Sequence, residues 1–129
     1  MTPEQKLKWV ILAKSAEWNN KPAPDYPCKN VDELYDLLTE SDEHWDARSE
    51  VRTSGTETGL ECPSSRNYES KAVAMKLPDG SWVGWTYWHG GGKYGDPDGI
   101  EWMGEAYDVE CHEEQKMVTV QTFTILSSP

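Results

Sequence analysis

The chain opens with apolar residues spaced as on one face of a helix. These residues are Leu7, Val10, Ile11 and Trp18. A repeat of three and four positions predicts a helix with one buried side. Residues 2–5 read Thr-Pro-Glu-Gln, in which Thr can cap the first turn and Gln can reach back to it. Three prolines within residues 21–27 remove backbone donors and favour extended backbone, so we expect the helix to end there.

A second helix is predicted from Asn30 to about Asp46, because residues 30–33 resemble another capping box. Its expected apolar stripe consists of Val31, Leu34, Leu37, Leu38 and Trp45. Residues 49–66 then show little periodicity and many small polar side chains. This composition predicts a long loop or a mobile segment.

Two strand-like runs, residues 68–77 and 81–89, are joined by Pro-Asp-Gly and predict a hairpin. A two-residue Asp-Gly turn would pair Leu77 with Trp82, whereas a three-residue turn with a glycine bulge pairs Leu77 with Ser81. The second register gathers the large apolar residues on one face: Val73, Met75, Leu77, Val83, Trp85 and Tyr87. Because a slip of one residue exchanges the faces, this pattern predicts the bulged turn. The other face would hold Ala72, Ala74, Trp82, Gly84, Thr86 and Trp88.

The remainder of the chain predicts a short helix followed by a second hairpin. A glycine-rich loop, residues 89–99, precedes four apolar residues that indicate the short helix: Ile100, Trp102, Met103 and Ala106. Residues 107–111 alternate like a strand, and residues 117–125 are β-branched and strand-like.

These elements predict one α+β domain over residues 1–129. Two N-terminal helices come first, followed by a mostly antiparallel sheet of about four strands in two hairpins, with the short helix between them. We divide the domain into a helical part (1–48), a loop (49–66) and a sheet part (67–126).

Acidic residues are concentrated in two blocks, and this changes the picture of the surface. Residues 25–50 contain nine Asp or Glu against two bases, and residues 96–114 contain eight Asp or Glu and no base. The chain as a whole carries a formal charge of −11. Such a surface repels nucleic acid and acidic membranes and attracts basic proteins. We therefore expect a basic protein as partner, and no direct binding to nucleic acid or membrane.

One row of acids stands out on the predicted second helix, because its members recur every three or four residues. A row of carboxylates about 6 Å apart can imitate a phosphate backbone, although a solvated helix face of an acidic protein has the same pattern. The second block would extend this surface if the fold brings it near. Trp82 and Trp88 could act as interface anchors, or could belong to the core. The candidate partner-binding residues are Asp32, Asp36, Glu40, Glu43, Trp82, Trp88, Asp96, Asp98, Glu101 and Glu105.

Enzyme signatures are incomplete. His89 and the three glycines after it resemble an oxyanion loop, but the chain has no G-x-S-x-G nucleophile elbow. Gly92-Lys93 resembles part of a phosphate loop, but Tyr94 stands where Ser or Thr should bind magnesium. Residues 96–101 match a calcium loop poorly, because the glycine comes at the fourth position instead of the sixth. We expect no catalytic residues, no metal and no cofactor.

Three cysteines, Cys28, Cys62 and Cys111, lack paired spacing and indicate free thiols in a reducing compartment. A zinc site that combines them with His112 has little support from spacing. The first residues lack the apolar run of a secretory signal, so we expect a cytoplasmic protein. The sequence does not indicate an oligomeric state.

Residues 68–123 resemble small uncharacterised proteins encoded by phages and prophages of Gram-negative bacteria. The residues that carry the resemblance are 68–71 (Tyr-Glu-Ser-Lys), 78–88 (Pro-Asp-Gly-Ser-Trp-Val-Gly-Trp-Thr-Tyr-Trp), 90–93 (Gly-Gly-Gly-Lys), 100–103 (Ile-Glu-Trp-Met) and 106–108 (Ala-Tyr-Asp). The first 65 residues, which contain the acidic helix, lie outside the resemblance. The family has no assigned chemistry, so the resemblance implies a phage origin and a host-cell cytoplasmic location, and no active-site residues.

We therefore expect a phage-type binding protein whose carboxylate-rich, DNA-mimic-like surface engages a basic host protein. Inhibition of a nucleic-acid-processing or defence protein would follow. Two alternatives stay open: a small-ligand binder or enzyme built around the loop from Gly90 to Gly99, and a phage structural or assembly component.

Overall fold

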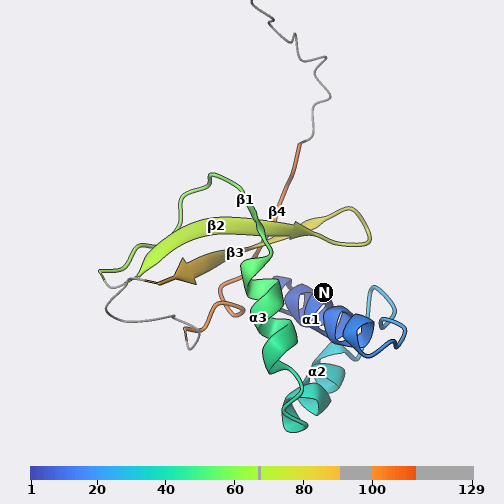
Figure 1. The fold of residues 1–129 in the computed structure, drawn as a ribbon. Coiled ribbons are helices and arrows are strands. Elements are labelled where there is room, and N and C mark those ends of the chain that lie inside the picture. Colours follow the sequence, from blue (N-terminus) through green and yellow to red (C-terminus); the bar gives the residue numbers. More distant parts are fainter. Residues whose placement is uncertain (67, 91–99, 113–129) are drawn as a thin grey trace, which may run out of the picture.

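Three helices lie on one face of a four-stranded antiparallel sheet (Figure 1). The computed structural model describes residues 1–66, 68–90 and 100–112. The sheet order is β1-β2-β3-β4, and α1 and α3 pack beneath the sheet while α2 packs on α1. The elements are α1 (Pro3–Trp18), α2 (Val31–Glu40), α3 (Trp45–Thr53), β1 (Thr56–Glu57), β2 (Glu69–Lys76), β3 (Trp82–His89) and β4 (Tyr107–Val109). The predicted α+β class is confirmed.

Helix α1 begins as predicted and ends before the prolines. Thr2 and Gln5 form a capping box, with each side chain bonded to the backbone of the other residue. At the other end Asn20 adopts a left-handed φ of 55°, and Lys21 N–H donates to the Ala16 carbonyl at 2.9 Å. These contacts form a Schellman motif, which satisfies carbonyls of the last turn. The capping motif, and not proline, therefore ends the helix.

Replacing Asn20 with glycine should raise the free energy of unfolding by up to about 1 kcal/mol. Glycine enters the left-handed region without the strain of a Cβ atom, although it also loses more entropy on folding. Chemical denaturation measures the change. A destabilised Asn20→Gly variant would show that the asparagine side chain contributes more than its backbone strain costs.

The predicted second helix is two helices. Helix α2 stops at Glu40, because Asp42 takes a left-handed φ of 57° and Glu43 N–H donates to the Leu38 carbonyl at 3.3 Å. This second Schellman motif reverses the chain direction, and α3 starts at Trp45. The prediction of one continuous helix to about Asp46 is wrong.

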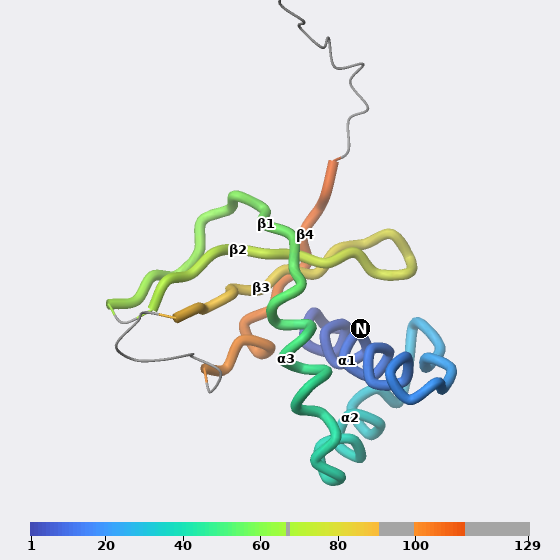
Figure 2. The backbone as a smooth tube through the Cα atoms, viewed as in Figure 1, coloured from blue at the N-terminus to red at the C-terminus, as the bar shows by residue number. Residues whose placement is uncertain are grey.

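The predicted loop over residues 49–66 contains the end of α3 and strand β1. Thr56 pairs with Ala74, and Glu57 pairs with Val73. Figure 2 shows the chain leaving β1, running beside β2 and turning to enter β2. The sequence could not indicate β1, because a strand of two exposed residues has no apolar alternation.

Gly55 lets β1 approach the core closely. A Cβ atom at this position would lie 2.7 Å from Val73 Cβ and 2.9 Å from Trp85 Cζ2. We therefore expect Gly55→Ala to lower the free energy of unfolding by about 1–3 kcal/mol, as overpacked cores do. Gly104→Ala is the control, since its nearest neighbour would be at 3.8 Å. Equal midpoints for both variants in urea denaturation would rule out this close approach.

The hairpin of β2 and β3 has the predicted bulged register. Lys76 pairs with Trp82, and Leu77 N–H donates to the Ser81 carbonyl at 2.8 Å. Gly80 has a φ of 86°, as the bulge requires. The large apolar residues consequently face the helices, and the small residues Ala72 and Ala74 lie on the far face.

Residues 100–106 form turns instead of the predicted short helix. Glu101 Oε1 accepts the backbone N–H groups of Met103 and Gly104, both at 2.9 Å, and Ala106 N–H donates to the Met103 carbonyl at 3.1 Å, so the chain makes a single capped turn before β4. Strand β4 follows and pairs with β3 through Trp82–Gly84. The predicted strand over residues 117–125 lies outside the described residues, so the fourth strand seen here is β1.

The core lies between the sheet and helices α1 and α3. Trp85 of β3 is at its centre with no exposed surface, and its ring centroid is 5.6 Å from that of Trp102. The other members are Leu7, Val10, Ile11, Ala47, Val51, Val73, Leu77, Val83 and Met103. A smaller cluster of Leu12, Cys28 and Val31 holds α2 against α1. Helix α2 thus forms an outer layer and contributes no buried residue to the central core.

Candidate functional site

The predicted row of acids is only partly a row. Asp32, Asp36 and Glu40 lie on α2 at intervals of four residues, so neighbours are about 6 Å apart along the helix axis. Glu43 lies beyond the helix, in the turn that leads to α3. Its position in a helical stripe was therefore a wrong prediction, although it remains close to Glu40 in the chain.

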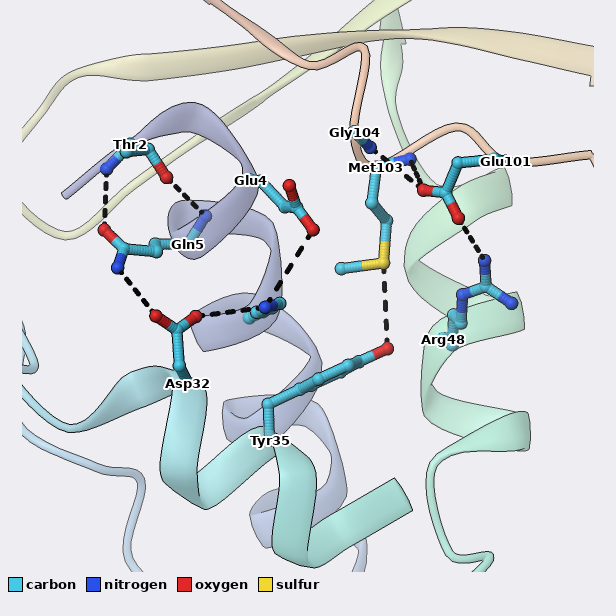
Figure 3. A network of polar contacts seen from close by, with 10 residues as sticks. Thr2, Glu4, Gln5, Asp32, Tyr35, Arg48, Glu101, Met103 and Gly104 are labelled. Atoms are coloured by element: carbon cyan, nitrogen blue, oxygen red, sulfur yellow. Dashed lines mark hydrogen bonds and ion pairs between the residues drawn. The ribbon is translucent and has the colours of Figure 1, made fainter. Parts of the chain in front are cut away.

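Asp32 is occupied within the molecule. Its carboxylate accepts Gln5 Nε2 at 3.0 Å (Figure 3). It also accepts Lys8 Nζ at 3.0 Å, and Lys8 lies 3.9 Å from Glu4 as well. The hydrogen bond from Gln5 and then that from Lys8 lower the pKa of Asp32. Asp32 consequently ties α2 to α1 and has less charge to offer a partner.

Much of the second acidic block is also engaged. Glu101 fixes its own turn and lies 4.0 Å from Arg48 Nη2, while Asp108 is 2.5 Å from Lys6 Nζ (Figure 3 shows the Glu101 contacts). Glu105 is exposed. Asp96 and Asp98 lie outside the described residues.

The two blocks approach each other at Tyr35 of α2. Its hydroxyl lies 3.7 Å from Met103 Sδ, and burial raises the pKa of Tyr35 while Arg48 and Lys8 oppose that shift (Figure 3). Two basic side chains thus separate the acids where the blocks meet. The predicted acids that fall within residues 1–66, 68–90 and 100–112 therefore do not form one continuous negative zone.

Several acids without an ion pair lie close together where α2 ends. We name Glu40, Asp42 and Glu43 the acidic rim. All three are exposed, and none lies within 4.0 Å of a basic side chain among residues 1–66, 68–90 and 100–112. Asp36 extends the rim by one helical turn and is likewise exposed.

The local placement of Glu40 is electrostatically unfavourable. It lies in the last turn of α2, which contains no basic residue, and a carboxylate there opposes the helix dipole. Asp42 and Glu43 lie between the negative end of α2 and the positive end of α3, where the two effects offset each other. Helix stability therefore gives no reason for an acid at position 40.

Beside the rim, α1, α2 and the segment after α1 border an open, mainly apolar groove of about 360 Å³, which we name the α1–α2 groove. Its apolar side chains include Leu12, Ala16, Leu34, Leu37 and Leu38, and Glu43 lies at its edge. Leu37 is 61% exposed. One exposed leucine is ordinary on a protein surface, so the interest of this region rests on the position of Leu37 beside both the groove and the acids.

Leu37 and Trp45 were predicted to be buried in one helical stripe, and both predictions are wrong. Trp45 is 59% exposed, and its ring lies 4.3 Å from that of His44. The chain offered one signal for Leu37: counted from Val31 it stands at i+6, off the face that positions i+3, i+4 and i+7 share. No comparable signal identified Trp45, because its exposure depends on the break at Asp42.

The two candidate tryptophans lie on β3, on the sheet face away from the helices. Trp82 is half-buried and lines a hollow of about 320 Å³ with Leu60, Ala74 and Val109. Trp88 is half-buried too, and its carbonyl accepts Arg52 Nη1 at 2.8 Å. Neither ring lies on the α2 surface, so the sheet separates these two residues from the rim.

His44, which precedes α3, is buried. Burial and the nearby Arg48 lower its pKa, whereas Asp42 opposes that shift. A lowered folded pKa means that the folded state favours the neutral ring, so this stabilisation is complete above the ordinary histidine pKa near 6.5 and is lost as the pH falls below it.

We therefore expect the melting temperature to fall between about pH 7.5 and pH 5.5, in the range where an ordinary histidine gains its proton. The variant His44→Gln cannot take up that proton, so its melting temperature should vary less over the same range. Thermal unfolding followed by circular dichroism measures both. Parallel curves for the two proteins would exclude His44 as the source.

The remaining chemical candidates show no assembled site. Cys28 is buried, Cys62 is half-buried and Cys111 is exposed, and all three are free thiols. No group of three or more His, Cys, Asp or Glu residues is placed to hold a metal ion within the described part of the chain. The alternative function built around the loop from Gly90 to Gly99 concerns residues that, apart from Gly90, lie outside the described part of the chain. Among the described residues, no helix is sufficiently long and apolar to span a bilayer.

Comparison with known proteins gives no match: no family model, curated protein or solved structure corresponds to this chain.

Proposed function

We propose that this chain is a non-enzymatic binding protein that engages a basic partner protein through the acidic rim. The observation that supports the proposal is the combination of three exposed, unpaired carboxylates with the exposed Leu37 and Trp45 beside them. Apolar anchors supply most of the affinity at protein interfaces, and complementary charge speeds encounter and selects the partner.

The contrast between paired and unpaired acids also supports the rim as the contact. Asp32, Glu101 and Asp108 each have a basic neighbour, so an added cationic partner gains less from them. Glu40 has no such neighbour and lies at the unfavourable end of a helix dipole. A positively charged partner would relieve that local cost.

The proposed partner is a nucleic-acid-binding protein of a host cell, in line with the resemblance to phage proteins. Occupation of its basic surface would prevent phosphate binding, and inhibition would follow. The fold shortens the predicted carboxylate row to Asp36 and Glu40 plus the turn. This arrangement favours general charge complementarity over close imitation of a phosphate backbone.

The test is capture of host proteins on the immobilised chain at about 0.05 M and about 0.5 M salt, where screening differs strongly. A rim variant, Glu40→Gln/Asp42→Asn/Glu43→Gln, serves as the matched bait. We expect a basic protein that the natural chain retains at low salt, that high salt releases and that the rim variant fails to retain. Added DNA should compete with the chain for this protein.

Retention of the same proteins by the rim variant would contradict the proposed contact. A captured partner that stays bound at high salt and is not displaced by DNA would contradict the proposed partner class.

A further inference from the structure

We infer that the α1–α2 groove receives apolar side chains from a basic amphipathic helix of the partner. The inference rests on the proposed function, since it supplies the apolar half of the same interface. It adds the shape of the bound segment, which the acids alone do not determine.

The residues that line the groove suit apolar side chains of a ligand. Leucine side chains from both helices form its walls, and Leu37 stands 61% exposed at its border. At about 360 Å³ the groove lies near the lower limit for small-molecule pockets. It suits one or two protruding side chains better than a large ligand.

Charge around the groove determines which helix fits. Glu43 lines it in the turn after α2, with Glu40 and Asp42 nearby in the chain, whereas Lys21 lines it in the segment after α1. Lysine or arginine on the incoming helix would lie beside the acidic rim. The single positive charge of Lys21 disfavours basic residues at its own end and so gives the bound helix a direction.

The walls of the groove favour a helix over an extended segment. An added strand gains its affinity from unpaired backbone groups at a sheet edge. Here the walls are α1 and α2, whose backbone groups bond within each helix or its cap, together with Pro22 and Pro24, which have no backbone N–H to donate. Recognition must therefore use side chains, and an amphipathic helix presents several on one face.

Two labelled peptides of about 15 residues and equal positive charge provide the probes. One has leucine along one face of a helix and lysine along the opposite face, and the other has serine in place of each leucine. Fluorescence anisotropy measures binding to the natural chain, to the rim variant and to the variants Leu37→Ala, Lys21→Glu and Leu60→Ala. Leu60 is 49% exposed on the far side of the sheet, so Leu60→Ala is the matched control.

We expect the leucine peptide to bind about tenfold more tightly than the serine peptide, because leucine burial adds affinity. Leu37→Ala should remove most of that difference, Lys21→Glu should strengthen binding of both peptides, and Leu60→Ala should change neither. Equal affinity of the two peptides, or an equal loss in the Leu60→Ala control, would overturn the inference.

The same data separate this inference from the proposed function. Binding of both peptides that depends on the acidic rim but not on Leu37 would leave the proposed function standing and remove the groove. Equal binding of the peptides to the rim variant and to the natural chain would contradict both the groove inference and the proposed function.

Discussion

The variant Trp85→Ala loses about 3–5 kcal/mol of unfolding free energy, as expected when a large buried aromatic side chain is deleted. Trp85 has no exposed surface and lies against Trp102. Its indole N–H also donates to the Arg52 carbonyl at 3.3 Å, which joins β3 to the end of α3. Urea denaturation followed by circular dichroism measures the change. A domain of this size has about 5–15 kcal/mol in total, so the variant should be close to unfolding.

Trp45→Ala is the matched control for this prediction. It removes the same side chain from a position that is 59% exposed, where substitutions usually change stability by no more than about 0.5 kcal/mol. Losses of similar size in the two variants would contradict the assigned core. The control has a second use, because Trp45→Ala should weaken partner binding without weakening the fold.

The rim variant, Glu40→Gln/Asp42→Asn/Glu43→Gln, should bind the captured partner at least about tenfold more weakly. Three lost charge contacts at up to about 1 kcal/mol each account for that loss. The same variant should be as stable as the natural chain or slightly more stable, because Glu40 no longer opposes the dipole of α2. Isothermal titration and chemical denaturation measure the two quantities.

The control for the rim removes the same number of charges elsewhere: Glu61→Gln/Glu69→Gln/Glu110→Gln. These three acids are exposed and lie outside α2 and its turn. If the control weakens binding as much as the rim variant does, net charge and not the rim attracts the partner. Loss of stability in the rim variant alone would show instead that its carboxylates support the fold.

The hairpin was predictable because its turn and its apolar pattern agree. Gly80 allows the bulge, and only that bulge places Val83 and Trp85 on the side where the helices lie. The capping box of α1 was predictable for the same reason, since Thr2 and Gln5 interact within one turn. Local chemistry determined both features.

Helical periodicity reveals neither the division of the second helix, which is a local turn, nor strand β1, which depends on a contact between distant residues. The chain turns at Asp42, which adopts a left-handed conformation. Because the residue is not glycine, the sequence gives no sign of the turn. Strand β1 exists because Gly55 allows close approach to Val73, more than 15 positions later in the chain.

The location of the candidate site could be predicted from the sequence, but the residues that form it could not. The acidic character of α2 is evident from composition, but the ion pair between Lys8 and Asp32 requires two helices to be placed side by side. Similarly, the contact between Arg48 and Glu101 depends on α3 meeting the turn before β4. Of the apolar partners of the rim, Leu37 could be inferred from its place on the helix, whereas the exposure of Trp45 depends on the break at Asp42.

Hydrogen exchange of the chain with and without its captured partner tests the central claim most directly, because it locates the contact without any mutation. The account predicts slower exchange for backbone amides from Leu37 to Trp45, at the end of α2 and the turn into α3. Protection confined to β2 and β3 on the far face of the sheet, with this segment unchanged, would contradict it.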